Sequence, residues 1–249
     1  MNNTMIALVT GANKGIGREI AAQLAALGHT VVIGARSAEL GEKTAAELRA
    51  TGADVTSVVL DVTDPATVAS AAGTVEARYG RLDALVNNAA VSRRPGGDLA
   101  GQRPSTADLD TVRDIFETNY LGVMTATNTL LPLLRRSATP RIVNVSSGAG
   151  SLALMADKDQ WNDEHLPISV GYSPSKTALT ALTLQYAREL HSEGILVNAV
   201  CPGYCATDLN DHSGHRTPAQ GAVAAVRMAT IPADGPTGTF SNDEGPMPW

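Results

Sequence analysis

The 249-residue sequence lacks several features that would assign it to well-known classes of protein. It has only two cysteines, Cys201 and Cys205, and such a pair without nearby histidine offers neither a disulfide framework nor a good zinc site. No uninterrupted apolar run approaches the roughly 20 residues of a membrane span. The net charge is −6 and no block of basic residues occurs, so nothing favours nucleic acid or an anionic membrane as a partner. We therefore expect no metal, no nucleic acid and no membrane.

The N-terminal segment also lacks the basic region of a signal peptide. Residues 1–10 lead through a short apolar run directly to Gly11, which is typical of a first strand. Hydrophobic residues make up 43% of the chain, as in globular proteins, and no linker rich in proline or serine divides it. We expect a single domain over residues 1–249 and a cytoplasmic location.

Short β-branched runs alternate with longer alanine-rich segments of helical period. Strands are expected at 6–10, 30–35, 54–60, 84–87, 141–146, 196–200 and, shorter, near 237–240. Helices are expected at about 15–27, 38–51, 65–79, 106–136 with a break or bend, and 174–192. This alternation predicts an α/β fold, a doubly wound parallel sheet of about seven strands with helices on both faces. Ligands of such sheets bind beyond the carboxyl ends of the strands.

The first expected strand is followed by Thr10-Gly-Ala-Asn-Lys-Gly-Ile-Gly17, a turn that contains three glycines. Glycine lets backbone amides approach a pyrophosphate, and the helix behind the turn directs its N-terminal dipole at the anion. A purely structural turn between strand and helix is the alternative. The context predicts a dinucleotide site formed by Gly11, Asn13, Lys14, Gly15, Ile16 and Gly17.

The second expected strand ends in Gly34-Ala-Arg36, without a carboxylate. Proteins that bind NAD usually place a carboxylate there for the ribose 2′-hydroxyl, whereas an arginine accommodates the 2′-phosphate of NADP. Arg36 supplies such a cation and Lys14 a second one. The sequence therefore favours NADP(H), with NAD(H) as the alternative.

Tyr172 and Lys176 are four residues apart near the start of the last long helix. Residues with this spacing share one helix face, and a cation beside a phenol lowers the tyrosine pKa from its reference of about 10. Pro174 disfavours helical geometry at Ser173, so the regular helix is expected to begin at Pro174 with Tyr172 just outside it. A surface pair without chemical consequence is the alternative.

Five motifs occur in an order and spacing that resemble the short-chain dehydrogenase/reductase family, and within it the carbonyl reductases. They are Thr10-Gly-x3-Gly-x-Gly17, Asn87-Asn-Ala-Ala90, Val143-Asn-Val-Ser-Ser147, Tyr172-x3-Lys176 and Cys201-Pro-Gly-x3-Thr207. The resemblance covers essentially the whole chain. It implies a Rossmann-type fold and NADPH-dependent, reversible reduction of a small ketone or aldehyde. Alcohol oxidation as the working direction, or a non-catalytic NADP-binding regulator, is the alternative, and monomer or homodimer is left open.

The resemblance also implies roles for individual residues. Ser147 would hydrogen-bond the carbonyl oxygen, Tyr172 would donate the proton, and Lys176 would lower the tyrosine pKa. Asn119 would hold a proton-relay water. The other residues expected beside the cofactor are Arg36, Asp61, Val62, Asn87, Asn88, Ala89, Pro202, Gly203 and Thr207, with Tyr172 and Lys176 also in contact.

The interval from Ser147 to Tyr172 is longer than is usual in this family. The extra segment, roughly 155–169, contains Lys158, Trp161 and His165. We expect it to form a lid or wall of the substrate pocket and to alter the surface on which family members dimerise. A plain surface excursion is the alternative.

Overall fold

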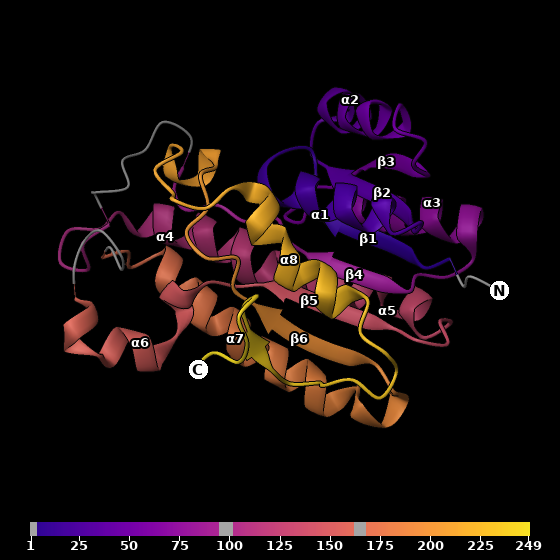
Figure 1. The fold of residues 1–249 in the computed structure, drawn as a ribbon. Coiled ribbons are helices and arrows are strands. Elements are labelled where there is room, and N and C mark those ends of the chain that lie inside the picture. The colour runs from indigo at the N-terminus through magenta and orange to yellow at the C-terminus, as the bar shows by residue number, and fades with distance from the viewer. Residues whose placement is uncertain (1–3, 95–101, 162–167) are drawn as a thin grey trace.

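The computed structural model describes residues 4–94, 102–161 and 168–249. Within these residues, seven parallel strands form one sheet in the order β3-β2-β1-β4-β5-β6-β7 (Figure 1). The strands are β1 (Ile6–Thr10), β2 (Thr30–Ala35), β3 (Val55–Val59), β4 (Ala84–Asn87), β5 (Arg141–Val145), β6 (Leu196–Val200) and β7 (Phe240–Ser241). The predicted doubly wound parallel sheet is confirmed, and its strand bounds differ from the expected ones by at most a few residues.

Helices cover both faces of this sheet. They are α1 (Gly15–Ala26), α2 (Ala38–Arg49), α3 (Pro65–Tyr79), α4 (Leu109–Phe116), α5 (Gly122–Leu134), α6 (Leu152–Ala156), α7 (Tyr172–Glu189) and α8 (Pro218–Ala229). Among the described residues, no helix combines the length and the apolar character needed to cross a bilayer.

Each face of the sheet has its own apolar core. Ala7 and Val9 of β1 lie in a buried cluster with side chains of α1, α2 and α8, whereas Leu8 lies in a second cluster with α3, α5 and α7. Successive residues of a strand point to opposite faces, so a strand that is buried on both sides is apolar throughout. The continuous apolar runs of the sequence follow from this arrangement.

The sequence prediction missed α8. Thr217 caps this helix through a hydrogen bond from the Gln220 amide, and Pro218 occupies its first turn. The buried face of α8 is built largely from glycine and alanine. The capping box at Thr217 and Gln220 was the signal that could have located it.

The segment expected as one broken helix at 106–136 consists of α4 and α5, which are joined by a π-helical turn, η1 (Glu117–Leu121). Asn119 lies in this turn and is fully buried. Such turns inside helices occur frequently at functional sites. The predicted break is therefore confirmed, and it falls at a residue expected in the site.

The expectation that α7 begins at Pro174 was wrong, because the helix begins at Tyr172. Gly171 already has helical geometry (φ −85°, ψ −56°), and the Ser173 amide donates to the Ser169 carbonyl at 3.2 Å. Pro174 therefore stands in the first turn, where a helix does not need the missing N–H group. Tyr172 and Lys176 consequently share one regular helix.

The interval between Ser147 and Tyr172 contains α6 and a 3-10 turn at Lys158–Gln160. The Ala153 amide of α6 donates to the Trp249 carbonyl at 2.8 Å, so the end of the chain packs against this segment. Trp161 is exposed, although its Nε1 donates to the Met155 carbonyl at 2.8 Å. Residues 162–167, with His165, lie outside the described residues, and the role of this segment as a lid stays a prediction.

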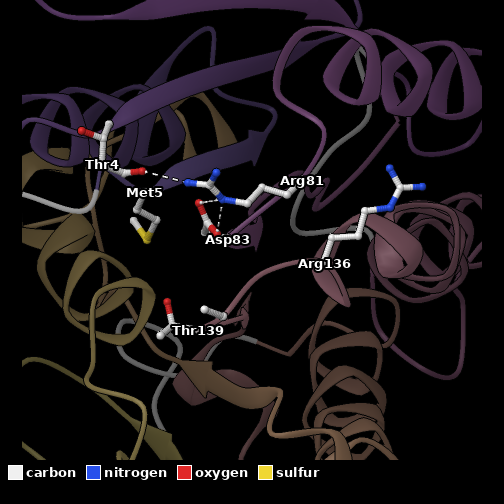
Figure 2. A pocket seen from close by; sticks show the side chains of 7 residues that line it. Thr4, Met5, Arg81, Asp83, Arg136 and Thr139 are labelled. Carbon is white, nitrogen blue, oxygen red and sulfur yellow. Dashed lines mark hydrogen bonds and ion pairs between the residues drawn. The ribbon is translucent and has the colours of Figure 1, made fainter.

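A small pocket lies at the amino ends of β1 and β4, opposite the end where ligands of such sheets bind (Figure 2). Its buried carboxylate, Asp83, accepts hydrogen bonds from the Ile6 amide at 2.8 Å and from Arg81 Nε at 3.0 Å. Arg81 also donates to the Thr4 carbonyl at 3.3 Å. These contacts join the starts of two neighbouring strands and explain the pocket as a structural feature.

Candidate active site

A cleft opens at the carboxyl ends of the strands, on both sides of the point between β1 and β4 where the chain reverses its direction of winding. It encloses about 1650 Å³, including the space at its open mouth. The residues expected at the cofactor that line it are Gly11, Asn13, Lys14, Gly15, Ile16, Gly17, Arg36, Asp61, Val62, Asn88, Ala89, Tyr172, Lys176, Pro202 and Thr207. The folded sheet thus brings these scattered residues together.

The glycine-rich turn packs directly on the loop after β4. Gly11 has a φ of +64°, and a Cβ there would lie 3.0 Å from Ala89 Cα. A Cβ on Gly17 would lie 2.4 Å from Asn88 Nδ2. The first turn of α1 holds no acidic residue, and no side chain caps it. Its amides therefore remain available for an anion, as a phosphate site requires.

The two cations expected near the 2′-phosphate have different surroundings. Arg36 is exposed on the cleft wall and makes no ion pair with any residue that the structure describes. Lys14 Nζ instead lies 2.6 Å from Asp208 Oδ2, a contact that the sequence did not predict. The hydrogen bond from Lys14 holds the pKa of Asp208 below its ordinary value. Both side chains are exposed, and of the two only Lys14 has an ion-pair partner among the described residues.

Loops after β4 and β6 meet across the mouth of the cleft. Ser92 Oγ donates to the Leu209 carbonyl at 2.7 Å, and Arg93 Nη1 donates to Asp211 Oδ2 at 2.8 Å. Asp211 has a left-handed φ of 53°, which turns the second loop back toward the first. No pattern in the sequence indicated these contacts, because the partners lie more than a hundred residues apart in the chain.

Asn87 does not line the cleft, which corrects the expectation that it contacts the cofactor. Its side chain is buried and donates to Asn144 Oδ1 at 2.9 Å and to Thr127 Oγ1 at 3.1 Å. Asn88 faces the cleft instead, and its Nδ2 donates to the Thr10 carbonyl at 2.9 Å. Asn87 therefore connects β4 to β5 and α5, while Asn88 supports the first turn.

The Ser147 hydroxyl lies near the Tyr172 hydroxyl, close enough to act against the raised pKa of the tyrosine. Ser147 itself is part-buried and stands beside the residues that line the cleft rather than among them. The neighbouring Ser146 is buried, and its Oγ donates to the Lys176 carbonyl at 3.2 Å. Ser147 is therefore the serine whose hydroxyl can act together with Tyr172.

Gly150 allows the turn that carries Ser147 to pack on α7. Ser147 caps a short 3-10 turn, Gly148–Gly150, by accepting a hydrogen bond from the Ala149 amide at 3.2 Å. A Cβ on Gly150 would lie only 2.7 Å from the carbonyl carbon of Lys176. The absence of a side chain at this position thus sets the distance between the serine turn and the helix that carries Tyr172.

Lys176 is buried, and its Nζ donates to the Val145 carbonyl at 2.8 Å. The same nitrogen lies over the ring face of Tyr172, 5.7 Å from the ring centroid. Burial lowers the pKa of Lys176 to about 8, because a charged ammonium is poorly solvated there.

Burial raises the pKa of Tyr172 to about 12, although the hydrogen bond with Ser147 acts in the opposite direction. The expected decrease caused by Lys176 is therefore not found in this structure. The ammonium faces the ring rather than the hydroxyl, and desolvation of the phenolate dominates. Tyr172 consequently stays protonated at neutral pH.

The side chain of Asn119 is fully engaged inside the protein. Its Oδ1 accepts from the Val91 amide at 2.9 Å, and its Nδ2 donates to the Val91 carbonyl at 2.9 Å and to Ser175 Oγ at 3.0 Å. Ser175 Oγ in turn donates to the Tyr172 carbonyl at 2.7 Å. Asn119 therefore connects the loop after β4 to the start of α7, and its role in holding a relay water stays a prediction.

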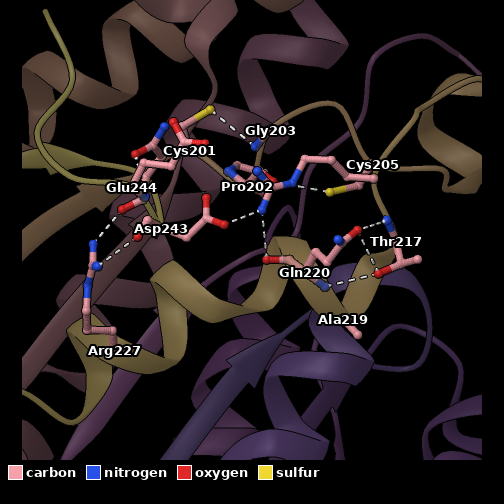
Figure 3. A network of polar contacts seen from close by, with 12 residues as sticks. Cys201, Pro202, Gly203, Cys205, Thr217, Ala219, Gln220, Arg227, Asp243 and Glu244 are labelled. Carbon is pink, nitrogen blue, oxygen red and sulfur yellow. Dashed lines mark hydrogen bonds and ion pairs between the residues drawn. The ribbon is translucent and has the colours of Figure 1, made fainter.

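Gly203 lies behind the cleft rather than in its wall, unlike Pro202 and Thr207. It has a φ of +75°, and a Cβ there would lie 2.6 Å from Arg216 Cδ. Figure 3 shows the polar network around it, in which Asp243 from the C-terminal segment binds Arg216 at 2.5 Å. Gly203 thus shapes the loop that presents Pro202.

In the described parts of the chain, no group of three or more His, Cys, Asp or Glu side chains could hold a metal ion.

Comparisons with known proteins agree with this geometry. The sequence model described as "short chain dehydrogenase" matches residues 5–217. The chain is 35% identical to short-chain dehydrogenase/reductase 1 of Saponaria officinalis, over 94% of this chain and 92% of that protein. It is 31% identical to (+)-neomenthol dehydrogenase of Capsicum annuum, over 96% and 95% of the two chains. The solved structure of salutaridine reductase from Papaver somniferum superposes with a TM-score of 0.80 at 31% identity, covering 96% of this chain and 99% of that one.

Proposed function

The chain belongs to the short chain dehydrogenase family, and from that membership we propose that it reduces ketones or aldehydes to alcohols with NADPH, reversibly. One observation carries the proposal. Tyr172, with the Ser147 hydroxyl beside it, lines one end of a cleft whose other end holds the glycine-rich turn and Arg36. A proton donor and an anion site therefore belong to one cavity.

The cleft fits a phosphorylated dinucleotide. The amides that follow Gly11 and precede α1 would hold the pyrophosphate, and Arg36 would hold the 2′-phosphate. Asp61 and Val62 would flank the adenine, while Asn88, Ala89, Pro202 and Thr207 would line the remaining length. Bound NADPH would supply the hydride for the carbonyl carbon. The match between residues and cofactor rests on the uncapped helix terminus and on an accessible arginine.

The catalytic residues would act on the carbonyl oxygen of the substrate. Ser147 would donate a hydrogen bond to that oxygen as negative charge develops, and Tyr172 would give it a proton as general acid. The raised pKa of Tyr172 keeps the phenol protonated, which suits a proton donor. Lys176 would keep the tyrosine ring in place and contribute positive charge, and Asn119 would hold the relay water.

The same residues would serve alcohol oxidation, in which Tyr172 would accept the proton that it donates in reduction. The working direction would then follow from the relative amounts of oxidised and reduced cofactor.

We propose that residues 1–249 act as one oxidoreductase domain in the cytoplasm. The free thiols of Cys201 and Cys205 agree with a reducing compartment.

The proposal is tested by following NADPH absorbance with a panel of cyclic, aromatic and aliphatic ketones, quinones and keto esters. Tyr172→Phe is expected to lower kcat by about 10²- to 10⁴-fold while NADPH still binds. Tyr204→Phe is the matched control, because the Tyr204 hydroxyl contacts Ser213 and lies outside the cleft lining. Full turnover by Tyr172→Phe would reject the catalytic role. NADPH binding without turnover of any carbonyl by the wild type would favour a regulator.

A further inference from the structure

Cys201 lies directly after β6 and is buried between two loops of the proposed site. Its Sγ accepts a hydrogen bond from the Gly148 amide at 3.1 Å and another from the Gly203 amide at 3.4 Å. Figure 3 shows the second of these contacts. One sulfur atom therefore joins the loop after β5 to the loop after β6.

Both donors stand next to residues of the proposed site. Gly148 directly follows Ser147, whose hydroxyl lies near that of Tyr172. Gly203 directly follows Pro202, which lines the cleft. The sulfur thus contacts the backbone next to Ser147, the proposed oxygen-binding serine. It also contacts the backbone next to Pro202 in the cleft wall.

Cys201 is itself held in place by β7 and the C-terminal segment. Its amide donates to the Ser241 carbonyl of β7 at 2.8 Å. Its side chain packs with Ala199 and Phe240 in a small apolar cluster that is separate from the two main cores, and Met247 packs against this cluster. The C-terminal segment therefore supports the sulfur, and the sulfur supports the serine turn.

We propose that Cys201 is a positioning residue for carbonyl reduction, because its sulfur holds the Gly148 amide and thereby directs the Ser147 hydroxyl toward Tyr172. The inference rests on the proposed function. Burial raises the pKa of the Cys201 thiol, so at neutral pH the sulfur accepts these bonds as a neutral group. Cys201 takes no part in proton or hydride transfer.

Cys205 provides a matched control within the same loop. It is also buried, but its thiol donates to the Pro202 carbonyl at 3.3 Å and makes no contact with the serine turn. Its sulfur instead packs against α8, because a Cβ added to Gly221 would lie 2.4 Å from Cys205 Sγ. Removing this thiol deletes a buried sulfur of the same size without touching Gly148.

The kinetic test compares Cys201→Ala, Cys201→Ser and Cys205→Ala in steady-state NADPH oxidation. Cys201→Ala removes the sulfur acceptor from the part-buried Gly148 amide and the exposed Gly203 amide, and we expect kcat to fall about 5- to 30-fold with the KM for NADPH changed less than about 2-fold. Cys201→Ser restores an acceptor and should recover kcat to within about 3-fold of wild type. Cys205→Ala should keep the wild-type kcat. Equal losses in Cys201→Ala and Cys205→Ala would overturn the proposal.

Amide hydrogen exchange tests the contact without any turnover. The Gly148 and Gly203 amides should exchange faster in Cys201→Ala than in wild type, and at the wild-type rate in Cys205→Ala. Should the wild type reduce no carbonyl, the proposed function fails, and the exchange rate at Gly148 then decides the structural contact. Unchanged exchange at Gly148 in Cys201→Ala would refute the inference whatever the activity.

Discussion

Replacing Gly150 with alanine tests whether the serine turn must pack directly on α7. A Cβ at this position would lie 2.7 Å from the Lys176 carbonyl carbon, 2.8 Å from Lys176 Cβ and 2.9 Å from the Thr177 amide nitrogen. Two of these three atoms are backbone atoms, so no rotation of a side chain can relieve the overlap. The turn must therefore move away from the helix, and Ser147 must move with it.

The expected cost follows from overpacking a close contact. Inserting a methyl group into such a site typically destabilises a protein by about 1–3 kcal/mol. For a chain of 249 residues each kcal/mol shifts Tm by about 2–4 °C. We therefore expect Tm to fall by about 2–12 °C, and kcat to fall by about 10- to 100-fold because the serine hydroxyl is displaced.

Gly148→Ala is the matched control in the same turn. A Cβ on Gly148 would lie 3.6 Å from Met247 Cε and 3.7 Å from Cys201 Sγ, which are ordinary contacts. Thermal unfolding by circular dichroism and steady-state NADPH oxidation measure both variants beside the wild type. Equal Tm and kcat in the two variants would refute the reasoning, because the close approach of Gly150 to α7 would then carry no energy.

Three further predictions concern charged groups. Burial lowers the pKa of Lys176 to about 8 in the folded protein, whereas the lysine has a pKa of about 10.5 in the unfolded chain. Between these two pH values the unfolded chain binds more protons than the folded protein. The free energy of unfolding of the wild type should therefore rise with pH across this interval. Lys176→Met should therefore gain up to about 3 kcal/mol relative to wild type at pH 7 and progressively less toward pH 10, as measured by urea unfolding. Arg36→Ser should raise the KM for NADPH about 10-fold or more with little change for NADH. Asp208→Asn releases Lys14 from its ion pair and should tighten NADPH binding about 2- to 5-fold in titration calorimetry.

Each of these predictions has a result that contradicts it. A stability difference between Lys176→Met and wild type that does not change with pH would show that Lys176 keeps its ordinary pKa. Equal changes in the KM for NADPH and NADH would remove Arg36 from the 2′-phosphate site, and Arg18→Ser, in α1 outside the cleft lining, controls for loss of charge. Weaker NADPH binding in Asp208→Asn would mean that the Lys14 contact organises the site rather than competing with the cofactor.

Local sequence patterns were sufficient for much of the sheet and for the residues that follow each strand. β1, β2, β4 and β6 have the predicted bounds, because a strand that is buried on both faces needs a continuous apolar run that polar turns end sharply. Asp64 and Pro65 likewise mark the start of α3 through a side-chain cap. Polar and glycine residues that follow such strands must meet at one edge of a parallel sheet, so the cleft could be predicted from their positions along the chain.

Side-chain partners and burial were beyond the reach of the sequence. Asn87 and Asn88 are neighbours with the same side chain, yet only Asn88 lines the cleft. Lys14 pairs with Asp208, which lies 194 residues away. Such partners depend on loop geometry at a distance in the chain, and no local periodicity or propensity reports it.

By itself the sequence determined the order of the strands and the residue types at each strand end, because these depend on local propensity, apolar periodicity and turn chemistry. It also indicated the family, through five motifs in a characteristic order. Only the tertiary structure decided that α7 begins at Tyr172, that burial raises rather than lowers the pKa of that phenol, and that Cys201 supports the serine turn. Desolvation and hydrogen-bond geometry depend on every element packed around a group. They exist only once the chain has folded.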